Sequence, residues 1–365
     1  AWHYKTCLVM ITYNNLWDKV CDFKNLLLSA RKAQKGKRFQ DNVGRFNFNL
    51  EEELLLLQNK LQNHAYQPGL YRSFYIYEPK KRMISAAPYR DRVVHHALCN
   101  IIEPIFDKMF IYDSYANRKE KGTHQAVNRF TEFCRKNRYV LKCDIEKYFP
   151  SIDHRILYEL IAKRITDQKC LWLIKLLIDS SNPQEEVIHY FDGDGLFTPY
   201  ERKQGLPIGN LTSQFFANIY LNEFDHFVKE TLRCEYYIRY VDDFVVLDND
   251  KKKLRNIKKE MERYLERLRL RLHPRKCNVF PVRQGTNFLG YRIFPSYRLL
   301  NRDNIKRFKK RLKQLQWLYG VGLLGLNKLT ASILSWIAHA NHADTYNLRR
   351  RILGVTRFVV GAGTN

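Results

Sequence analysis

Apolar residues recur with helical spacing in several segments of the chain. Leucines at three- and four-residue steps predict a helix over residues 47–64. An apolar stripe also predicts a helix over 254–268, which we expect Pro274 to end. Further helices are expected over 91–106, over most of 155–178, over 213–228 and, in a basic C-terminal part, from Asn304 onward.

Short runs of β-branched and aromatic residues predict strands between these helices. One run spans 74–77; the basic turn 79–82 and a second strand from Met83 follow it. A short buried strand is expected over 139–143, and the chain returns to strand over 288–293. The basic turn therefore lies at the tip of a predicted hairpin.

A second predicted hairpin carries the most informative chemistry. The runs 236–240 and 244–247 enclose Val241-Asp242-Asp243 and place two adjacent acids at a tight turn. Like charges held together are costly unless a cation or an unusual proton neutralises them. Paired Mg²⁺ ions suit this role and are used in nucleotidyl transfer, although an ordinary Asp-rich turn is the alternative for this segment alone. Asp144, which ends the strand 139–143, is the candidate third acid.

Charge and composition narrow the class of partner. Lys and Arg outnumber Asp and Glu by 63 to 37, a net charge of +26, which predicts a polyanionic partner, with nucleic acid ahead of membrane. Apolar residues make up 45% of 365 residues, enough for a folded chain with two or three subdomains. No apolar run approaches the length of a membrane span, so no membrane partner is expected.

The eight cysteines are scattered and include no C-x-x-C pair. Neither a zinc site nor a disulfide framework is therefore expected. This use of cysteine fits a reducing compartment.

The order of strand and Asp144, helix, hairpin with Asp242-Asp243, and helix matches the palm of nucleotide polymerases, and the chain resembles reverse transcriptases from about Arg82 to Tyr291. The resemblance implies an α+β right-hand polymerase, whose palm holds a small antiparallel sheet flanked by helices and whose thumb is helical. The implied parts are an N-terminal helical extension at 1–69, fingers at 70–137 and 155–204, palm at 138–154 and 205–292, and thumb at 293–365.

The resemblance also implies roles for individual residues. Asp144, Asp242 and Asp243, with Ile145 beside them, would bind two Mg²⁺ ions, for which Mn²⁺ could substitute, and the substrates would be dNTPs. Lys276 resembles the lysine that can protonate the leaving pyrophosphate, although an ordinary surface lysine is the alternative.

Nucleotide-binding positions follow from the same resemblance. The residues that resemble the contacts to triphosphate and template are Lys80, Lys81, Arg82 and Arg90, with Arg82 the best match for the triphosphate. Phe149, five residues after Asp144, resembles the aromatic gate that excludes a ribose 2′-OH. A plain core aromatic is the alternative for Phe149.

Two positions suggest a subfamily. Most reverse transcriptases carry Gln at the position of Ile208 and Pro at that of Gln214, whereas Ile-Gly-x-x-x-Ser-Gln resembles the enzymes of diversity-generating retroelements. These enzymes copy an RNA template repeat into cDNA with errors opposite adenines. The resemblance implies RNA template and cDNA or primer as partners, together with a small, basic, pentameric accessory variability protein. A cytoplasmic location is expected, in a bacterial, archaeal or phage-encoded system.

Other readings stay open at this stage. A retron, group II intron-like or phage-defence reverse transcriptase would share the polymerase motifs, although the retron signatures N-A-x-x-H and V-T-G are absent from the chain. A rival from a different class is a non-catalytic RNA-binding scaffold with a polymerase fold. The three acids argue against that rival, because an idle site has no reason to keep them clustered.

Overall fold

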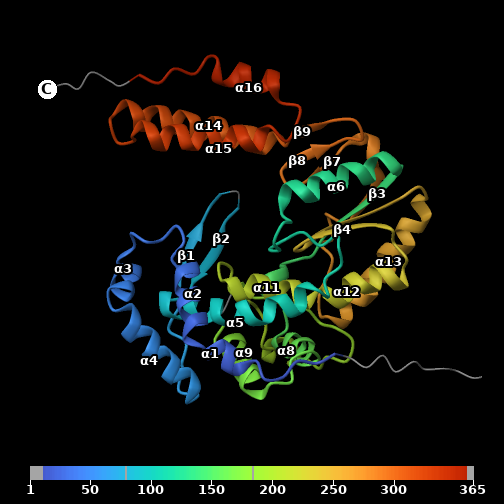
Figure 1. The fold of residues 1–365 in the computed structure, drawn as a ribbon. Coiled ribbons are helices and arrows are strands. Elements are labelled where there is room, and N and C mark those ends of the chain that lie inside the picture. The colour runs from blue at the N-terminus through green and yellow to red at the C-terminus, as the bar shows by residue number, and fades with distance from the viewer. Residues whose placement is uncertain (1–10, 79, 183–184, 360–365) are drawn as a thin grey trace, which may run out of the picture.

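The computed structural model describes residues 11–78, 80–182 and 185–359, and the largest sheet among them is four-stranded and antiparallel. This sheet, called the central sheet below, lies in the right-hand part of Figure 1. Pro79 of the predicted basic turn, and the outer ends of the predicted extension and thumb, lie outside the described residues. The strands, in sheet order, are β4 (Tyr236–Tyr240), β5 (Asp243–Asp248), β3 (Tyr139–Asp144) and β6 (Asn278–Pro281).

Both faces of this sheet are covered, which explains why its strands are apolar runs. Leu141 and Phe244 belong to one buried cluster, shared with α13 (Lys251–Arg267), and Val140 and Val245 belong to a second, shared with α6 (Thr123–Lys136). Successive side chains of a strand point to opposite faces, so adjacent residues enter different cores.

Helices from the first part of the chain surround one long helix, α5 (Tyr89–Asp107), on the side of the sheet where α13 lies (Figure 1). They are α1 (Trp17–Cys21), α2 (Phe23–Ala33), α3 (Asp41–Phe48) and α4 (Leu50–Gln62). The hairpin of β1 (Arg72–Ile76) and β2 (Arg82–Ala86) extends from this group. Between β3 and the central hairpin lie α7 (Tyr148–Ser151), α8 (His154–Ala162), α9 (Gln168–Asp179), α10 (Thr198–Glu201), α11 (Leu211–Tyr220), α12 (Asn222–His226) and a π-helical turn, Phe227–Thr231.

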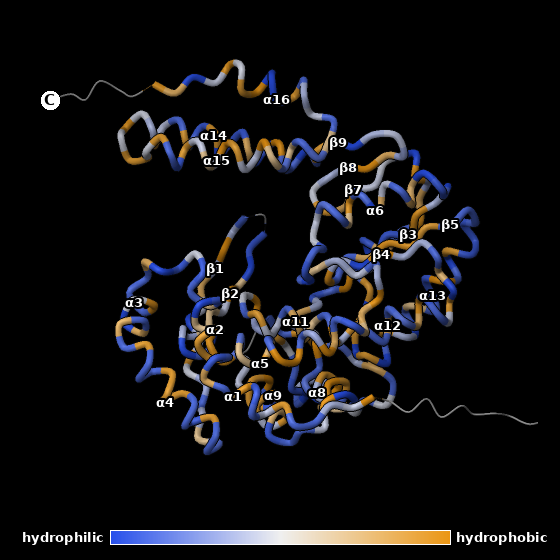
Figure 2. The backbone as a smooth tube through the Cα atoms, viewed as in Figure 1, coloured by the Kyte–Doolittle hydropathy of each residue, from blue (hydrophilic) through white to orange (hydrophobic). Residues whose placement is uncertain are grey.

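The C-terminal part begins with a small sheet and continues as helices. A 3-10 turn (Val282–Gln284) leads into the sheet β7 (Thr286–Phe288), β8 (Tyr291–Ile293) and β9 (Arg298–Leu300). The helices are α14 (Arg302–Gly320), α15 (Leu326–Ala340) and α16 (Tyr346–Leu353). In Figure 2, α14 is mostly hydrophilic, whereas α15 carries more apolar residues. These features confirm the predicted α+β fold with a small antiparallel sheet and a helical C-terminal part.

Three predicted elements differ from the structure in where they end or in how they are divided. The helix predicted over 254–268 ends at Arg267, and Arg269, which adopts a left-handed φ of 52°, ends it before Pro274 is reached. The strand expected over 288–293 is a hairpin, since Leu289 and Gly290 both have positive φ, 48° and 91°, and form its turn. The helix expected over 213–228 is also divided, into α11, α12 and the π-helical turn.

A disulfide that the sequence did not predict joins Cys143 and Cys277, whose Cα atoms lie 4.2 Å apart. The antiparallel register of β3 and β6 pairs Lys142 with Asn278, so Cys143, which follows Lys142, meets Cys277, which precedes Asn278, although 134 residues separate the two cysteines. Five other described cysteines are free and buried, and Cys7 lies outside the described residues.

Among the described helices, none combines the length and apolar character that a membrane crossing needs.

His95 on α5 provides a test of the packing. Burial lowers the pKa of this imidazole from 6.5 to about 3, and its side chain is 2% exposed. In the unfolded chain the same group takes up a proton below pH 6.5, so acid favours unfolding. We expect this one residue to lower the unfolding free energy by about 2 kcal/mol between pH 7 and pH 5. In urea unfolding, the free energy of unfolding of His95→Leu should fall by about 2 kcal/mol less between pH 7 and pH 5 than that of the wild type. An equal fall in both proteins would contradict a buried, neutral His95.

Candidate active site

The three predicted acids lie at one end of the central sheet. Asp144 is the last residue of β3 and is paired in register with Asp243, the first residue of β5. Asp242 occupies the turn between β4 and β5, where Val241 has a left-handed φ of 57°. The amide of Ile145 donates to the Asp242 carbonyl at 3.2 Å, which fixes the turn against the end of β3. Sheet pairing therefore brings together acids almost 100 residues apart.

These carboxylates disfavour one another's charge. Burial raises the pKa of Asp242 to about 6, the charges of Asp144 and Asp243 act in the same direction, and Arg82 opposes them. Burial also raises the pKa of Asp243, while nearby Lys142 lowers it. A cation placed among the acids would relieve this repulsion.

Two lysines supply part of the compensating charge. The Lys276 ammonium lies 2.6 Å from Oδ2 of Asp144, so the structure brings this predicted residue to the acids. The Lys142 ammonium lies 3.4 Å from Oδ1 of Asp243. Sequence analysis missed Lys142, although its place two residues before Asp144, on the same face of β3, could have indicated it.

The donor atoms suit a hard divalent cation. Oδ1 of Asp243 is buried and makes no hydrogen bond to the described residues, and carboxylate oxygens are the ligands that Mg²⁺ prefers. No three Asp, Glu, His or Cys side chains in the described part of the chain already form a metal-holding group. Lys276 is paired with Asp144, and Lys142 approaches Asp243. Ile145 has a buried side chain without a ligand atom, so only its carbonyl could contribute.

The basic hairpin of β1 and β2 brings Arg82 near the three acids. Arg82 begins β2 and is exposed, and its charge acts on the pKa of Asp242. The Lys81 ammonium lies 4.6 Å from the centre of the Tyr75 ring, and Lys80 is exposed at the tip of the hairpin.

Arg90 has a different setting from that of the hairpin residues. It belongs to the first turn of α5, which directs its guanidinium to the Gln67 carbonyl, 3.2 Å away, and toward the Tyr66 ring. Arg90 therefore lies on α5, apart from the hairpin that carries Lys80, Lys81 and Arg82.

One loop contacts Phe149 and carries Ile208. Phe149 is half-buried in α7, and its carbonyl accepts the Leu206 amide at 2.9 Å. Two residues later the Ile208 carbonyl accepts the Ser85 amide of β2, also at 2.9 Å. The next residue, Gly209, has a φ of 119°, and a Cβ there would lie 3.0 Å from Ile84. This loop thus joins α7 to the basic hairpin. Gln214 is half-buried on α11.

A buried arginine that sequence analysis did not single out supports the acidic turn. Arg239 of β4 has no exposed side-chain surface and donates to both carboxylate oxygens of Asp225, which is equally buried, at 2.8 Å. It also donates to Asn218 and to the Val241 carbonyl, each at 3.2 Å. The buried pair of Arg239 and Asp225 therefore fixes the position of the Val241 carbonyl, which immediately precedes Asp242.

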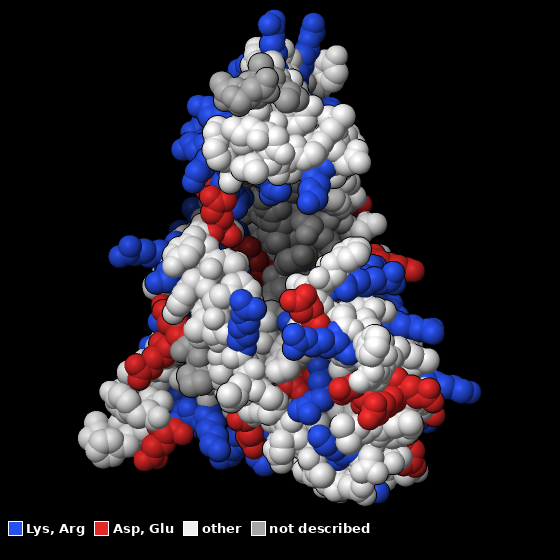
Figure 3. Space-filling model, turned by 90° about the vertical axis from the view of Figure 1, so that its left-hand side faces the viewer, with Lys and Arg blue, Asp and Glu red and all other residues white. Residues whose placement is uncertain are grey.

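The C-terminal helices lie opposite these residues across a hollow. The space-filling view shows this hollow between the upper and lower parts of the molecule, with Lys and Arg around its upper margin (Figure 3). A cavity of about 520 Å³ there is lined by Glu78 beside the basic hairpin and by Asn304, Arg307 and Arg311 of α14. Lys310 lies 3.5 Å from Glu78 across the same gap.

Comparison with known proteins agrees with this geometry. The family model described as reverse transcriptase (RNA-dependent DNA polymerase) matches residues 77–293, more than half of the chain. Protein YkfC of Escherichia coli is 28% identical over 284 residues, covering 67% of this chain and 72% of that protein. The group II intron-encoded protein LtrA of Lactococcus lactis is 23% identical over 358 residues, covering 80% of this chain and 57% of that protein.

A solved structure of apo telomerase from Candida tropicalis covers 79% of this chain and 62% of that chain, with a TM-score of 0.49 and 14% identity. On the family match, supported by three acids and a lysine at the end of the central sheet, the chain belongs to the reverse transcriptase family of RNA-dependent DNA polymerases.

Proposed function

We propose that this chain copies an RNA template repeat into cDNA, by adding dNTPs to a primer end at the site formed by Asp144, Asp242 and Asp243. The observation that carries the proposal is the meeting of these acids with Lys276 at the end of the sheet, within reach of the charge of Arg82. Such a group of charges suits the handling of a triphosphate.

Each of these residues has a defined part in the proposed reaction. Mg²⁺, when bound by the carboxylates, would neutralise charge and orient the primer 3′-OH for in-line attack on the α-phosphate, with pyrophosphate leaving. Mn²⁺ has the same preference for oxygen ligands and could replace it. Arg82 binds the triphosphate and stabilises the negative charge that develops on it. The Lys276 ammonium, 2.6 Å from Asp144, donates a proton to the departing pyrophosphate.

Phe149 supplies sugar selection in this proposal. Its ring belongs to the turn that follows Asp144, and a half-buried aromatic there restricts the space beside the sugar of an incoming nucleotide. A ribose, which carries a 2′-OH, would meet the ring, whereas a deoxyribose would fit.

Ile208 and Gln214 support assignment to a diversity-generating retroelement. Ile208 is held between α7 and the basic hairpin, where it can contact an incoming nucleotide only through apolar atoms. A glutamine there could hydrogen-bond and fix the nucleotide pose, so with isoleucine a mispaired nucleotide loses less relative to a correct one. The same assignment predicts a small, basic, pentameric accessory variability protein as partner.

We expect Ile208→Gln to raise fidelity at template adenines. One hydrogen bond to the correctly paired nucleotide is worth about 1 kcal/mol, so adenine errors should fall about fivefold. The measurement is sequencing of cDNA made on a defined RNA template, with errors opposite the other three bases as an internal control. An unchanged adenine error rate, with cDNA yield retained, would contradict this role of Ile208.

A group II intron-like activity is the second candidate, favoured by the similarity to LtrA. The chain spans 57% of the length of LtrA, so what it shares with that protein beyond the polymerase part is itself a proposal. Template choice separates the two functions. A pair of repeats near the gene that differ only at adenines would support the retroelement, and selective copying of an intron RNA would support the second candidate.

A further inference from the structure

Between α9 and the loop that carries Ile208, the described residues form one short helix, α10, and a buried arginine, Arg202, holds this segment in place. Arg202, with a side chain 3% exposed, donates from Nη2 to both carboxylate oxygens of Asp194 at 2.6 and 2.7 Å. Its Nη1 donates to the His189 carbonyl at 3.1 Å. Arg202 therefore ties its own end of this segment to His189 and Asp194 nearer the start of the segment.

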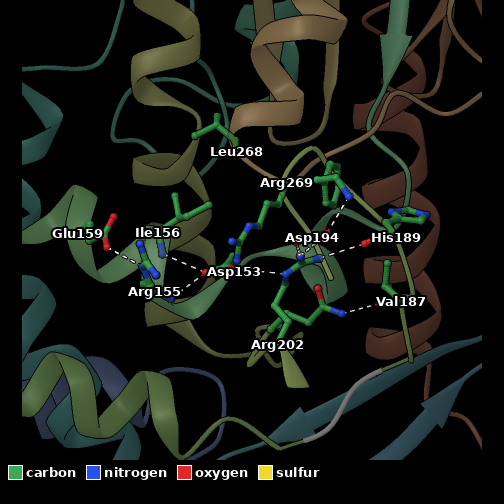
Figure 4. Close-up of polar contacts among 12 residues, drawn as sticks. Asp153, Arg155, Ile156, Glu159, Val187, His189, Asp194, Arg202, Leu268 and Arg269 are labelled. Carbon is green, nitrogen blue, oxygen red and sulfur yellow. Dashed lines mark hydrogen bonds and ion pairs between the residues drawn. The ribbon is translucent and has the colours of Figure 1, made fainter. Parts of the chain in front are cut away.

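Asp153 connects that closed segment to the core. Its Oδ2 accepts from Nη1 of Arg269 at 2.6 Å and lies 3.7 Å from Nε of Arg202. Its Oδ1 accepts the Arg155 and Ile156 amides and caps α8. One carboxylate, 2% exposed, is thus shared by two guanidinium groups and a helix end (Figure 4). We call Asp153, Asp194, Arg202 and Arg269 the Asp153 cluster.

The Asp153 cluster connects to Phe149 and to the loop of Ile208, the two positions proposed to contact the incoming nucleotide. Residues 203–206 run beside residues 149–154, and Asp153 is bridged to Gln204. The main-chain bonds between the two stretches are His154 N to Lys203 O, 3.0 Å, Gly205 N to Ile152 O, 2.8 Å, and Leu206 N to Phe149 O, 2.9 Å. This ladder ends at Phe149 on one stretch and two residues before Ile208 on the other.

The cluster also reaches the segment that carries Lys276. Arg269 follows the end of α13, and the Arg271 carbonyl two residues later accepts the Glu146 amide at 2.9 Å. The His273 amide then donates to the Asp144 carbonyl at 2.8 Å. Main-chain bonds therefore join the stretches at 144–149, 205–208 and 271–276. Asp153 contacts Arg202 and Arg269, which lie shortly before the last two of these stretches.

We infer that Asp153 and Arg202 are positioning residues for nucleotide selection, an inference that rests on the proposed function. They fix the separation between Phe149 and the loop of Ile208, and so set the space available beside the sugar of the incoming nucleotide. A steric gate can exclude a 2′-OH only if Phe149 and the loop of Ile208 both keep their positions, because a displacement of about 1 Å would make room for a hydroxyl group. Neither residue is assigned contact with the nucleotide itself.

The test compares four variants in single-nucleotide insertion. Arg202→Met removes the donors but keeps an apolar stem, Arg202→Lys restores one charge, and Asp153→Asn keeps an oxygen that can cap α8. Arg155→Met is the matched control, since its side chain is 79% exposed and pairs only with Glu159 among the ion pairs of the described residues. The readout is the ratio of kcat/KM for a dNTP to that for the matching rNTP.

We expect Arg202→Met and Asp153→Asn to lower this ratio about tenfold or more, Arg202→Lys to recover part of it, and Arg155→Met to leave it unchanged. Thermal unfolding identifies variants that fail to fold, and in that case the milder Asp194→Asn serves as the probe of the same contact. A purely structural role would reduce the kcat/KM values for dNTP and rNTP by the same factor and leave their ratio unchanged.

An unchanged ratio in folded, active variants would overturn the inference alone. Absence of any incorporation by the wild-type protein would overturn the proposed function and this inference with it.

Discussion

Asp242→Asn is expected to lower nucleotide incorporation on an RNA template by about a thousandfold or more, because a lost metal ligand removes several kcal/mol of transition-state stabilisation. Asp242 lies in the turn between β4 and β5, opposite the end of β3, and this half-buried residue has a carboxylate with a raised pKa of about 6. Asparagine has nearly the same size but no charge to hold a cation. Primer extension with Mg²⁺ and dNTPs measures the rate.

The same variant separates an enzyme from an RNA-binding scaffold. RNA affinity and the unfolding free energy should stay close to those of the wild type, since the substitution removes repulsion from Asp144 and Asp243. Asp18→Asn, an exposed acid on α1, is the charge-matched control and should keep full activity. Incorporation by Asp242→Asn within tenfold of the wild-type rate would contradict the assignment of this carboxylate.

The second large effect concerns stability. Arg239→Met should lower the unfolding free energy by about 3–5 kcal/mol, because it leaves the Asp225 carboxylate buried without its partner. Both side chains have no exposed surface, and Arg239 also supports the Val241 carbonyl at the acidic turn. Urea unfolding at neutral pH measures the change, and nucleotide incorporation should fall as well because the turn loses this support.

A double variant distinguishes loss of a charge pair from loss of packing. Adding Asp225→Leu to Arg239→Met removes the unpaired charge and should recover part of the stability, while the Tyr237 hydroxyl still loses its acceptor. Incorporation should stay low, since nothing replaces the donor to the Val241 carbonyl. A loss below about 1 kcal/mol in Arg239→Met would contradict the importance of the pair.

The main chemistry could be predicted from sequence because it depends on short, ordered motifs. Asp144 ends an apolar run and Asp242 lies between two others, so sheet formation alone brings them to one end. Lys276 meets Asp144 for the same reason, since it lies two residues before Asn278, and Asn278 pairs with Lys142, two residues before Asp144. The metal, gate and nucleotide roles of these residues stay predictions.

Features that depend on contacts between distant segments could not be predicted in this way. Arg239 occupies one of five positions in an apolar strand, and nothing local indicates that Asp225 of α12 neutralises it. Arg90 follows the basic turn closely in sequence, yet the start of α5 directs it elsewhere. The Cys143–Cys277 pair follows from strand register, which composition does not reveal.

The Asp153 cluster shows the same limit at the proposed nucleotide pocket. Asp153 follows Phe149 by four residues, but its partners Arg202 and Arg269 come from separate parts of the chain. A sequence motif suggests Phe149 as the gate residue. The contacts of Asp153 with Arg202 and Arg269, on which the proposed positioning role rests, appear only in the fold.

The most direct test of the central claim is primer extension by the wild-type protein on a defined RNA template with Mg²⁺ and dNTPs. The account predicts elongation to the template end, no products when Mg²⁺ is chelated, and an excess of errors opposite template adenines in the sequenced cDNA. Absence of any incorporation under conditions in which the protein binds the same RNA would contradict it, and would leave a polymerase fold that serves as an RNA-binding scaffold.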